Sequence, residues 1–409
     1  MQDKKKKSSG KIGIYFDTPL LVMILFMVMF GLVMVYSTSS YTASIDFDGD
    51  KFHYLKKQTI SAAIGLVFMA FTTLIPFTFY KNKIIAWVAY GFGIFMIMLV
   101  LSPLGGSGLG ATRWVYVAGF SIQPAEIVKI STIILTASVL SRMTREELQG
   151  WKSVAWTLIP AGISAGMILF ITNNFSSALI IGGIAFFMLI ATTGNNWRPF
   201  VVLGAFALLI GFCFLCIYNG WFSSFWSFRG GRVLAWLNPE AHYDEKGFQV
   251  VQGLYGIGSG GVFGKGLGKS VQKLGFLPEA SNDMIFSIIC EELGLFGAIG
   301  VLIVYSLILF RIKDLSKYVQ NSCANLMLVG VFTHIALQVI LNVAVVTNTI
   351  PNTGISLPFI SYGGSSILCL LTEMGFVFSA SLSANFYTHH FDETRENEQQ
   401  LSENVNNDV

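Results

Sequence analysis

Ten apolar segments, each about long enough to cross a lipid bilayer, constrain the fold of this chain more than any other feature. A helix needs roughly 20 apolar residues to cross hydrocarbon. Only 12% of the residues are charged, whereas a soluble protein carries about 25%. The sequence therefore predicts an all-α polytopic membrane protein with ten transmembrane helices. The segments lie near residues 18–39, 58–76, 83–102, 122–141, 154–172, 175–193, 199–218, 284–310, 322–346 and 361–385.

The positions of Lys and Arg predict the orientation of these helices. Short cytoplasmic loops carry an excess of Lys and Arg, and the larger share of the 26 such residues falls inside if the basic N-terminus is cytoplasmic. An even number of spans then leaves both termini in the cytoplasm. We expect a basic cytoplasmic N-terminus at 1–17, a ten-helix membrane domain at 18–387 and a disordered cytoplasmic tail at 388–409.

The unusual parts of the sequence lie on the predicted outer side. A large extracellular loop, about 219–283, joins the seventh and eighth helices. Three shorter outer regions are 103–121, 172–175 and 347–360. Because the inner loops are short and plain, we expect any chemistry at the outer leaflet.

One stretch, 247–297, combines a glycine-rich loop that carries lysines with an apolar segment that carries acids. Glu279 and Asp283 stand at the mouth of the eighth helix. A carboxylate in such a place costs free energy, which makes it a candidate functional residue. The basic loop favours an anionic substrate. A plainer alternative for Asp283 is that it caps the helix that follows, a common role for Asp.

Three motifs resemble the signatures of the shape, elongation, division and sporulation (SEDS) family, the FtsW/RodA/SpoVE proteins. They are GATRWVYVAGFSIQPAEIVK at 110–129, the stretch at 247–297 and PNTGISLPFISYGGSSIL at 351–368. The resemblance runs from the first helix to the last, and the motifs are more similar to the division and sporulation branch than to the elongation branch. It implies ten transmembrane helices with both termini inside, which agrees with the independent count of apolar segments.

The resemblance also implies a function. Such proteins are inverting peptidoglycan glycosyltransferases, which polymerise lipid II at the outer face of the cytoplasmic membrane. They work with a class B penicillin-binding protein and other divisome membrane proteins, which places this chain at the division septum. Nothing in the sequence indicates a nucleic-acid partner. The reaction displaces a polyprenyl pyrophosphate from a sugar, so it needs a base near the attacking hydroxyl and positive charge near the leaving group.

These requirements select the candidate site residues. Asp283 is the predicted general base, because it stands at the membrane mouth and matches the aspartate that the family requires. Asp283 and Glu279 are also candidate ligands of a divalent cation, Mg²⁺ or Mn²⁺. The predicted substrate-binding residues are Glu279, Lys129, Arg113, Glu126, Arg229, Arg232, Gln249, Gln252, Lys273 and Ser361.

Plainer roles remain open for several of these residues. Glu126 and Lys129, spaced i,i+3, form an ion pair that either faces the pyrophosphate or only stabilises a helix end. Arg113 either clamps phosphate or anchors the chain at the lipid interface. Arg229 and Arg232 contact either the substrate or anionic headgroups. Lys273 is either a substrate contact or a solvated surface residue.

One departure from the family pattern lies in the turn between the fifth and sixth helices. The family has Pro-Asp there, and this chain has Asn173-Asn174, so we leave the turn out of the predicted catalytic set. Two other functions remain, a lipid II flippase and a non-enzymatic divisome scaffold. A transporter site lies near the bilayer midplane, whereas the polar residues here gather near the outer leaflet. A scaffold does not explain why acids and cations converge on one side.

Overall fold

The fold is described by a computed structural model over residues 16–108, 111–117, 120–194, 196–218, 232–243 and 247–384. The predicted tail at 388–409 and residues 1–15 of the predicted N-terminal segment lie outside these residues. A long helix overlaps each of the ten apolar segments. These helices are α1 (Thr18–Asp46), α2 (His53–Thr73), α4 (Lys83–Leu99), α5 (Pro124–Leu140), α7 (Trp151–Ile171), α8 (Phe175–Thr193), α9 (Arg198–Tyr218), α12 (Ile285–Ser316), α13 (Ser322–Val346) and α14 (Gly364–Ser383).

Six of the described helices are long and apolar enough to cross a membrane, namely α1, α7, α8, α12, α13 and α14. Shorter apolar helices occupy Lys83–Leu99 and Arg198–Leu208. Three short helices, α3 (Phe77–Lys81), α6 (Arg145–Gln149) and α11 (Phe248–Gly260), lie outside the ten segments. The prediction of a largely helical, multi-pass membrane protein is confirmed at this level.

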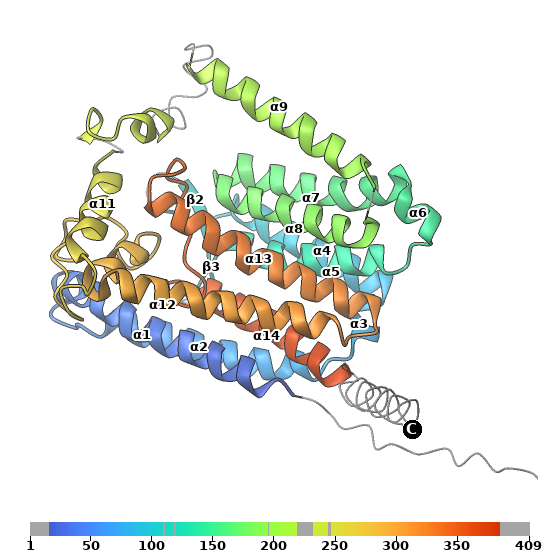
Figure 1. The fold of residues 1–409 in the computed structure, drawn as a ribbon, viewed down its shortest axis with the longest axis horizontal. Helices are drawn as coiled ribbons and strands as arrows, with labels where there is room; N and C mark the ends of the chain where they lie inside the picture. Colours follow the sequence, from blue (N-terminus) through green and yellow to red (C-terminus); the bar gives the residue numbers. More distant parts are fainter. Residues whose placement is uncertain are drawn as a thin grey trace, which may run out of the picture.

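The helices run along the long axis of the molecule (Figure 1). The beginning of α1 and the end of α14 lie at one end of the bundle, and α11 lies at the other end. The core is centred on α5, α13 and α14, whose residues are mostly buried. In contrast, α9 stands at the edge of the bundle (Figure 1).

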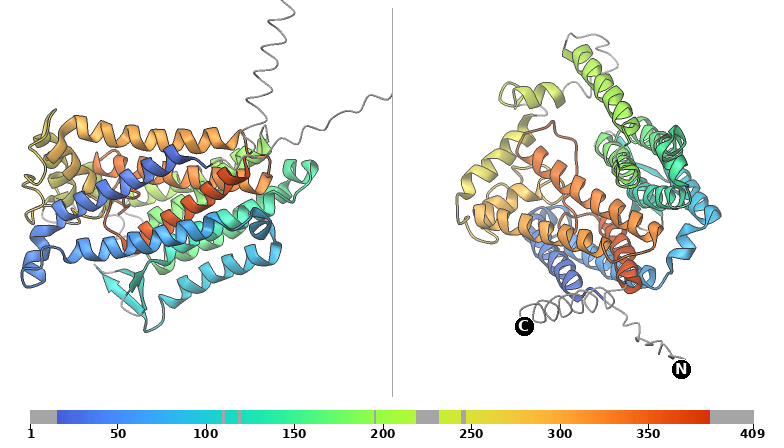
Figure 2. Two further views of the ribbon diagram at one scale, coloured as in Figure 1. Left: turned by 90° about the horizontal axis from the view of Figure 1, so that it is seen from below. Right: turned by 45° about the vertical axis from the view of Figure 1, so that its right-hand side comes forward.

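The outer region predicted as a loop at 103–121 instead holds a small antiparallel sheet in the order β1-β2-β3. Its strands are β1 (Gly105–Gly108), β2 (Ala111–Val117) and β3 (Phe120–Ile122). The β-branched and aromatic residues of β2 are typical strand formers. The sheet leads directly into α5, and Figure 2 shows it against one end of the bundle.

The glycine-rich stretch predicted as a loop within 247–297 is partly helical, because Gly256, Gly258 and Gly260 belong to α11. The chain then turns back against α12, which is kinked at Gly294 (φ 68°). The kink frees backbone groups that must find partners inside a membrane. Lys265 N and Gly266 N donate to the carbonyls of Glu291 and Glu292, each at 2.9 Å, and Leu295 N and Phe296 N donate back to the carbonyls of Gly261 and Val262 at 3.0 and 3.2 Å. The loop at 261–283 and the first turns of α12 are therefore one structural unit.

Candidate active site

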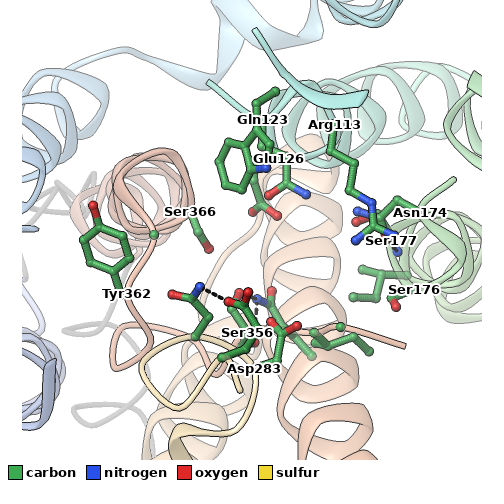
Figure 3. Close-up of a pocket in the computed structure, with 18 of the residues that line it drawn as sticks. Arg113, Gln123, Glu126, Asn174, Ser176, Ser177, Asp283, Ser356, Tyr362 and Ser366 are labelled. Atoms are coloured by element: carbon green, nitrogen blue, oxygen red, sulfur yellow. Dashed lines mark hydrogen bonds between the residues drawn. The ribbon is translucent and has the colours of Figure 1, made fainter. Parts of the chain in front are cut away.

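A polar cavity of about 370 Å³ opens among α5, α8, α13 and the segments that precede α12 and α14. Figure 3 shows Asp283 and Ser356 on one side of the cavity, with Arg113 and Glu126 on the opposite side. Most of its lining side chains carry charges, amides or hydroxyls, although it lies within a protein made largely of apolar helices. This cavity is the candidate active site.

Asp283 is half-buried and lies two residues before α12, so its carboxyl group faces the cavity rather than capping the helix. The residue at the N-cap is Met284, and no side chain caps α12. The capping alternative for Asp283 is therefore wrong. Burial and the neighbouring charge of Glu279 raise the pKa of the Asp283 carboxyl to about 7, against the opposing effect of Arg113 and Arg232. A carboxyl group with this pKa can take up a proton near neutral pH.

Glu279 and Asn282 form the acidic side of the cavity together with Asp283. Glu279 has a left-handed backbone (φ 54°), and its carboxylate accepts a hydrogen bond from the Asn282 amide. The amide oxygen of Asn282, Oδ1, is buried without a hydrogen-bond partner in the described part of the chain. Two carboxylates and an unpaired amide oxygen are the kind of ligands that Mg²⁺ and Mn²⁺ prefer. Among the described residues no three His, Cys, Asp or Glu side chains gather as a metal-binding group, so a cation here would take its remaining ligands from substrate or water.

Arg113 and Arg232 supply positive charge to the same cavity. Arg113, on β2, donates to the carbonyls of Thr172 and Asn173 at 3.3 and 3.0 Å. Arg232 donates to the carbonyl of Asn352 at 3.3 Å. Burial lowers the pKa of each guanidinium, and Asp283 raises it. With a normal pKa far above 7, both groups remain charged and can bind phosphate oxygens.

Glu126 and Lys129 form the predicted i,i+3 ion pair, with Nζ and Oε1 2.7 Å apart. The pair lies in the first turns of α5, which begins at Pro124, a residue well suited to the first helical position. Both side chains are almost completely buried, at 1% and 5% exposure, and both line the cavity. Glu126 Oε2 has no partner among the described residues. The pair is thus part of the cavity wall, with its free oxygen buried.

Of the remaining predicted substrate-binding residues that the structure describes, only Gln249 reaches the cavity. It donates to the carbonyl of Pro278 and accepts a bond from Asn352 Nδ2 at 2.7 Å. Arg229 lies outside the described residues. The structure does not bring Gln252, Lys273 or Ser361 to the cavity lining.

Each of these three side chains has a protein partner instead. Gln252 donates to the Tyr243 hydroxyl at 2.8 Å. Lys273 is buried and pairs with Glu292 at 2.7 Å, so its reading as a solvated surface residue is wrong, while its role as a substrate contact stays a prediction. The Ser361 hydroxyl donates to the carbonyl of Asn282 at 2.7 Å. Lys273 and Ser361 thereby join segments that are separated in the sequence, whereas Gln252 bonds to the segment just before α11.

Sequence reasoning missed several uncharged residues that line the cavity. The α7–α8 turn, set aside because of Asn173-Asn174, contributes Asn174, Ser176 and Ser177. Asn174 accepts a bond from Ser177 N at 3.1 Å and so caps α8, and Asn173 takes the left-handed conformation (φ 51°) that Asn tolerates. The predicted outer position of this turn is a signal that could have found it. The other missed residues include Gln123, Gln338, Asn352 and Ser356.

The fold and the cavity define a multi-pass helical membrane protein with an acidic group and a basic group facing each other in a polar chamber. The chain belongs to the FtsW/RodA/SpoVE family, because the family model described as a cell cycle protein matches residues 18–385. This confirms the family resemblance of the three motifs.

Individual relatives agree with this assignment. The chain is 33% identical over 368 residues to the probable peptidoglycan glycosyltransferase FtsW of Geobacter metallireducens, covering 90% of this chain and 94% of that protein. It is 35% identical over 373 residues to the stage V sporulation protein E of Bacillus subtilis, covering 89% and 96%. Both names belong to the division and sporulation branch.

Solved structures have the same fold. A chain from a structure of a peptidoglycan synthase complex that coordinates polymerization and crosslinking has a TM-score of 0.71 at 25% identity, covering 90% of this chain and 97% of that one. The rod shape determining protein RodA of Thermus thermophilus has a TM-score of 0.63 at 22% identity, covering 90% and 96%. The RodA likeness supports the fold alone.

Proposed function

We propose that this chain is a peptidoglycan glycosyltransferase that polymerises lipid II into glycan strands at the outer face of the plasma membrane. Family membership and the names of the relatives support the reaction class. The observation that carries the proposal is the half-buried Asp283, with a pKa of about 7, in a cavity that also holds two arginines. A base and a set of cations in one chamber match the two needs of the reaction.

In the proposed reaction, Asp283 accepts the proton of the attacking 4-hydroxyl of one sugar. The new bond joins that oxygen to the anomeric carbon of the other sugar, and the bond from this carbon to the pyrophosphate oxygen breaks. The electron pair leaves with the lipid pyrophosphate, whose charge Arg113, Arg232 and Lys129 stabilise. Attack opposite to the leaving group inverts the anomeric carbon.

The residues fit a divalent cation, which Glu279, Asp283 and Asn282 would hold. Such a cation would neutralise charge on the pyrophosphate. Glu279 has a second effect without any metal, because its charge helps to raise the pKa of Asp283.

The remaining parts of the proposal concern topology, place and partner. Ten transmembrane helices with both termini cytoplasmic accord with the bundle, in which α1 begins and α14 ends at the same side (Figure 1), and the cavity then faces outward. The membrane domain spans 18–387, between a basic N-terminus and a cytoplasmic tail. The likeness to a chain of a peptidoglycan synthase complex supports a class B penicillin-binding protein as the partner. The relative named FtsW supports a place at the septum among other divisome proteins.

The test is polymerisation by the purified protein, with a cognate class B penicillin-binding protein, lipid II and a divalent cation. The wild-type chain should give a ladder of glycan strands on a gel. Asp283→Asn should abolish the ladder, because the shape of the side chain is kept and the base is lost, while the protein remains folded and binds its partner.

Wild-type protein that gives no ladder in the presence of the partner would contradict the proposal. A vesicle assay with labelled lipid II would then distinguish a flippase from a scaffold. An Asp283→Asn variant that still polymerises would remove Asp283 from the role of base.

A further inference from the structure

A pair of ionisable side chains lies inside the bundle, separate from the cavity lining. His334 on α13 and Glu373 on α14 stand near the middle of their helices. Both side chains are at 0% exposure, and His334 Nδ1 lies 2.7 Å from Glu373 Oε2. An ionisable residue in such a place costs free energy, which marks it as a functional candidate, and the proposed reaction does not use this pair.

The charge of this pair depends on how many protons it holds. The hydrogen bond between Nδ1 and the carboxyl group contains one proton. A second proton, on His334 Nε2, makes the pair neutral overall. Because a net charge is costly in a low-dielectric interior, the form with two protons is favoured. Nε2 is therefore the atom at which the pair gains or loses a proton.

The remaining polar atoms of the pair point to bound water. His334 Nε2 and Glu373 Oε1 are buried and have no hydrogen-bond partner among the described residues. The same is true of Gln338 Oε1, one turn further along the same face of α13, and Gln338 lines the cavity. We call these three atoms the polar row. Buried polar atoms almost always have a partner, and water supplies it where the protein does not.

Charged groups of the cavity wall lie close to the polar row. Cys369, one turn before Glu373 on α14, is within electrostatic reach of Glu126, Lys129 and Glu373. Glu126 and Lys129 form an ion pair, so their charges cancel, and both line the cavity. The proton on His334 therefore decides whether this group of residues is neutral or carries one negative charge.

Other titratable side chains on the packed helices lie elsewhere. α8 has none, and those of α2 lie within its first five residues. On α12 they lie toward the two ends, apart from Tyr305, which donates to the carbonyl of Pro358. Tyr80 of α3 packs against Phe376. The charges that face the pair are thus those of Glu126 and Lys129.

We infer that water fills the polar row between Gln338 and His334, and that His334 Nε2 is a proton-binding site whose charge acts on the cavity. The proton enters from the cavity through this water and leaves by the same route. When it leaves, a negative charge remains near Lys129 and opposes the binding of an anionic diphosphate. Proton uptake and anion binding therefore favour each other. The link to substrate binding rests on the proposed glycosyltransferase function, whereas the site itself does not.

The first test is NMR of the full-length protein in lipid bilayers, with isotope-labelled histidine. The chain has five histidines, and His334→Gln assigns the signal of His334 by its loss. We expect Nε2 to carry a proton near neutral pH and this proton to exchange with water. Gln338→Leu removes the amide oxygen at a similar size and should slow the exchange at least tenfold, whereas Gln149→Leu on the exposed α6 should not.

Two results of this measurement would overturn the inference. The first is a His334 Nε2 without a proton, or with a proton that water does not reach in the wild-type chain. The second is an exchange rate that Gln338→Leu leaves unchanged, because the proton would then not pass through the polar row.

The second test compares KM for lipid II at pH 6.5 and 8.5 in the wild-type chain and in the double variant His334→Gln, Glu373→Gln. The double variant has an uncharged pair at both pH values and keeps Asp283. Loss of the proton in the wild-type chain adds one negative charge near the cavity, which should raise KM about three- to tenfold more than in the double variant. If the double variant does not fold, His334→Leu with Glu373→Met replaces it, because apolar residues of similar volume can replace a buried ion pair.

The same ratio of KM values in both proteins would overturn the action of the site on the cavity. A wild-type chain that does not polymerise lipid II would overturn the proposed function, and the link to substrate binding with it. The NMR measurement needs no activity, so it still decides whether His334 binds a proton in contact with water.

Discussion

At the scale of single residues, Asp283 is defined by what surrounds it. Its carboxyl group is half-buried, Glu279 lies four residues before it, and Arg113 and Arg232 line the same cavity. Burial and Glu279 favour the neutral acid, and the arginines favour the carboxylate. The balance leaves the pKa at about 7, so the proton occupancy of Asp283 changes within the neutral range.

This balance predicts the pH dependence of polymerisation. A base acts only when it is deprotonated, so the rate should rise with pH through about 7 and fall below it. Glu279→Gln removes a negative charge that raises the pKa of Asp283, so the midpoint should move to lower pH. Initial rates of glycan formation between pH 5.5 and 8.5 measure both midpoints. A midpoint that stays in place or rises in Glu279→Gln would contradict the electrostatic coupling.

At the scale of elements, the loop at 261–283 is fastened to α12 and α1 by two ion pairs. Glu291 pairs with Lys265 and Glu292 pairs with Lys273, each at 2.7 Å. Ser37 of α1 donates to both carboxylate oxygens of Glu292 at 2.8 Å and accepts from Lys273 at 3.0 Å. Because Asp283 is the last residue of this loop, the ion pairs also fix the approach to the active site.

The difference in burial between the two pairs predicts a difference in stability. Lys273 is 7% exposed and Lys265 is 34% exposed, whereas both glutamates are at 0%. Lys273→Met leaves Glu292 as an unpaired buried charge, which costs about 3–5 kcal/mol, and Lys265→Met should cost less because water reaches that pair. Melting temperatures in detergent compare the two variants. Lys273→Met combined with Glu292→Leu should recover part of the loss, and a double variant less stable than Lys273→Met would contradict this account.

The sequence predicts the helices of this protein well and the site only in part. The length of an apolar segment can be read from consecutive residues, without knowledge of tertiary contacts. A helix is accordingly found at each of the ten segments. Asp283, Arg113 and Glu126 could be found because a charged side chain at or within a membrane costs free energy, which marks it as a functional candidate. Lys273 and Ser361 could not be placed, because their partners, Glu292 and the carbonyl of Asn282, are set by tertiary contacts. The amides and hydroxyls of the cavity carry no charge and are not distinguishable from ordinary polar residues in the sequence.

At the scale of the whole molecule, the bundle has two different ends. The sheet and α11 lie toward one end, and the start of α1 and the end of α14 lie at the other (Figures 1 and 2). The cavity is on the side of the sheet, because Arg113, Trp114 and Tyr116 of β2 line it. The connection between α5 and α7 is basic, with Arg145 at the start of the short helix α6 and Lys152 at the start of α7. Since positive charge favours the cytoplasmic side, the cavity should face outward.

Labelling of single cysteines in intact cells tests this orientation. Asp48 lies in the turn between α1 and α2, Glu146 lies on α6, and both are exposed. A membrane-impermeant maleimide should label Asp48→Cys in intact cells and Glu146→Cys only after permeabilisation, with the wild-type chain as the background for its own cysteines. The reverse pattern would place the cavity on the cytoplasmic side and exclude polymerisation at the outer face.

The kink at Gly294 has a consequence for how the protein is made. The backbone groups that the kink opens are paired with residues 261–266 of the preceding loop, so the first two turns of α12 cannot rest in hydrocarbon until that loop has folded back against them. During synthesis, the start of α12 therefore obtains its missing hydrogen-bond partners from the loop that precedes it in the chain. Membrane insertion of α12 and assembly of the cavity are therefore coupled. A substitution that stops the loop from folding back against α12 should reduce the amount of inserted protein rather than the rate of the inserted protein.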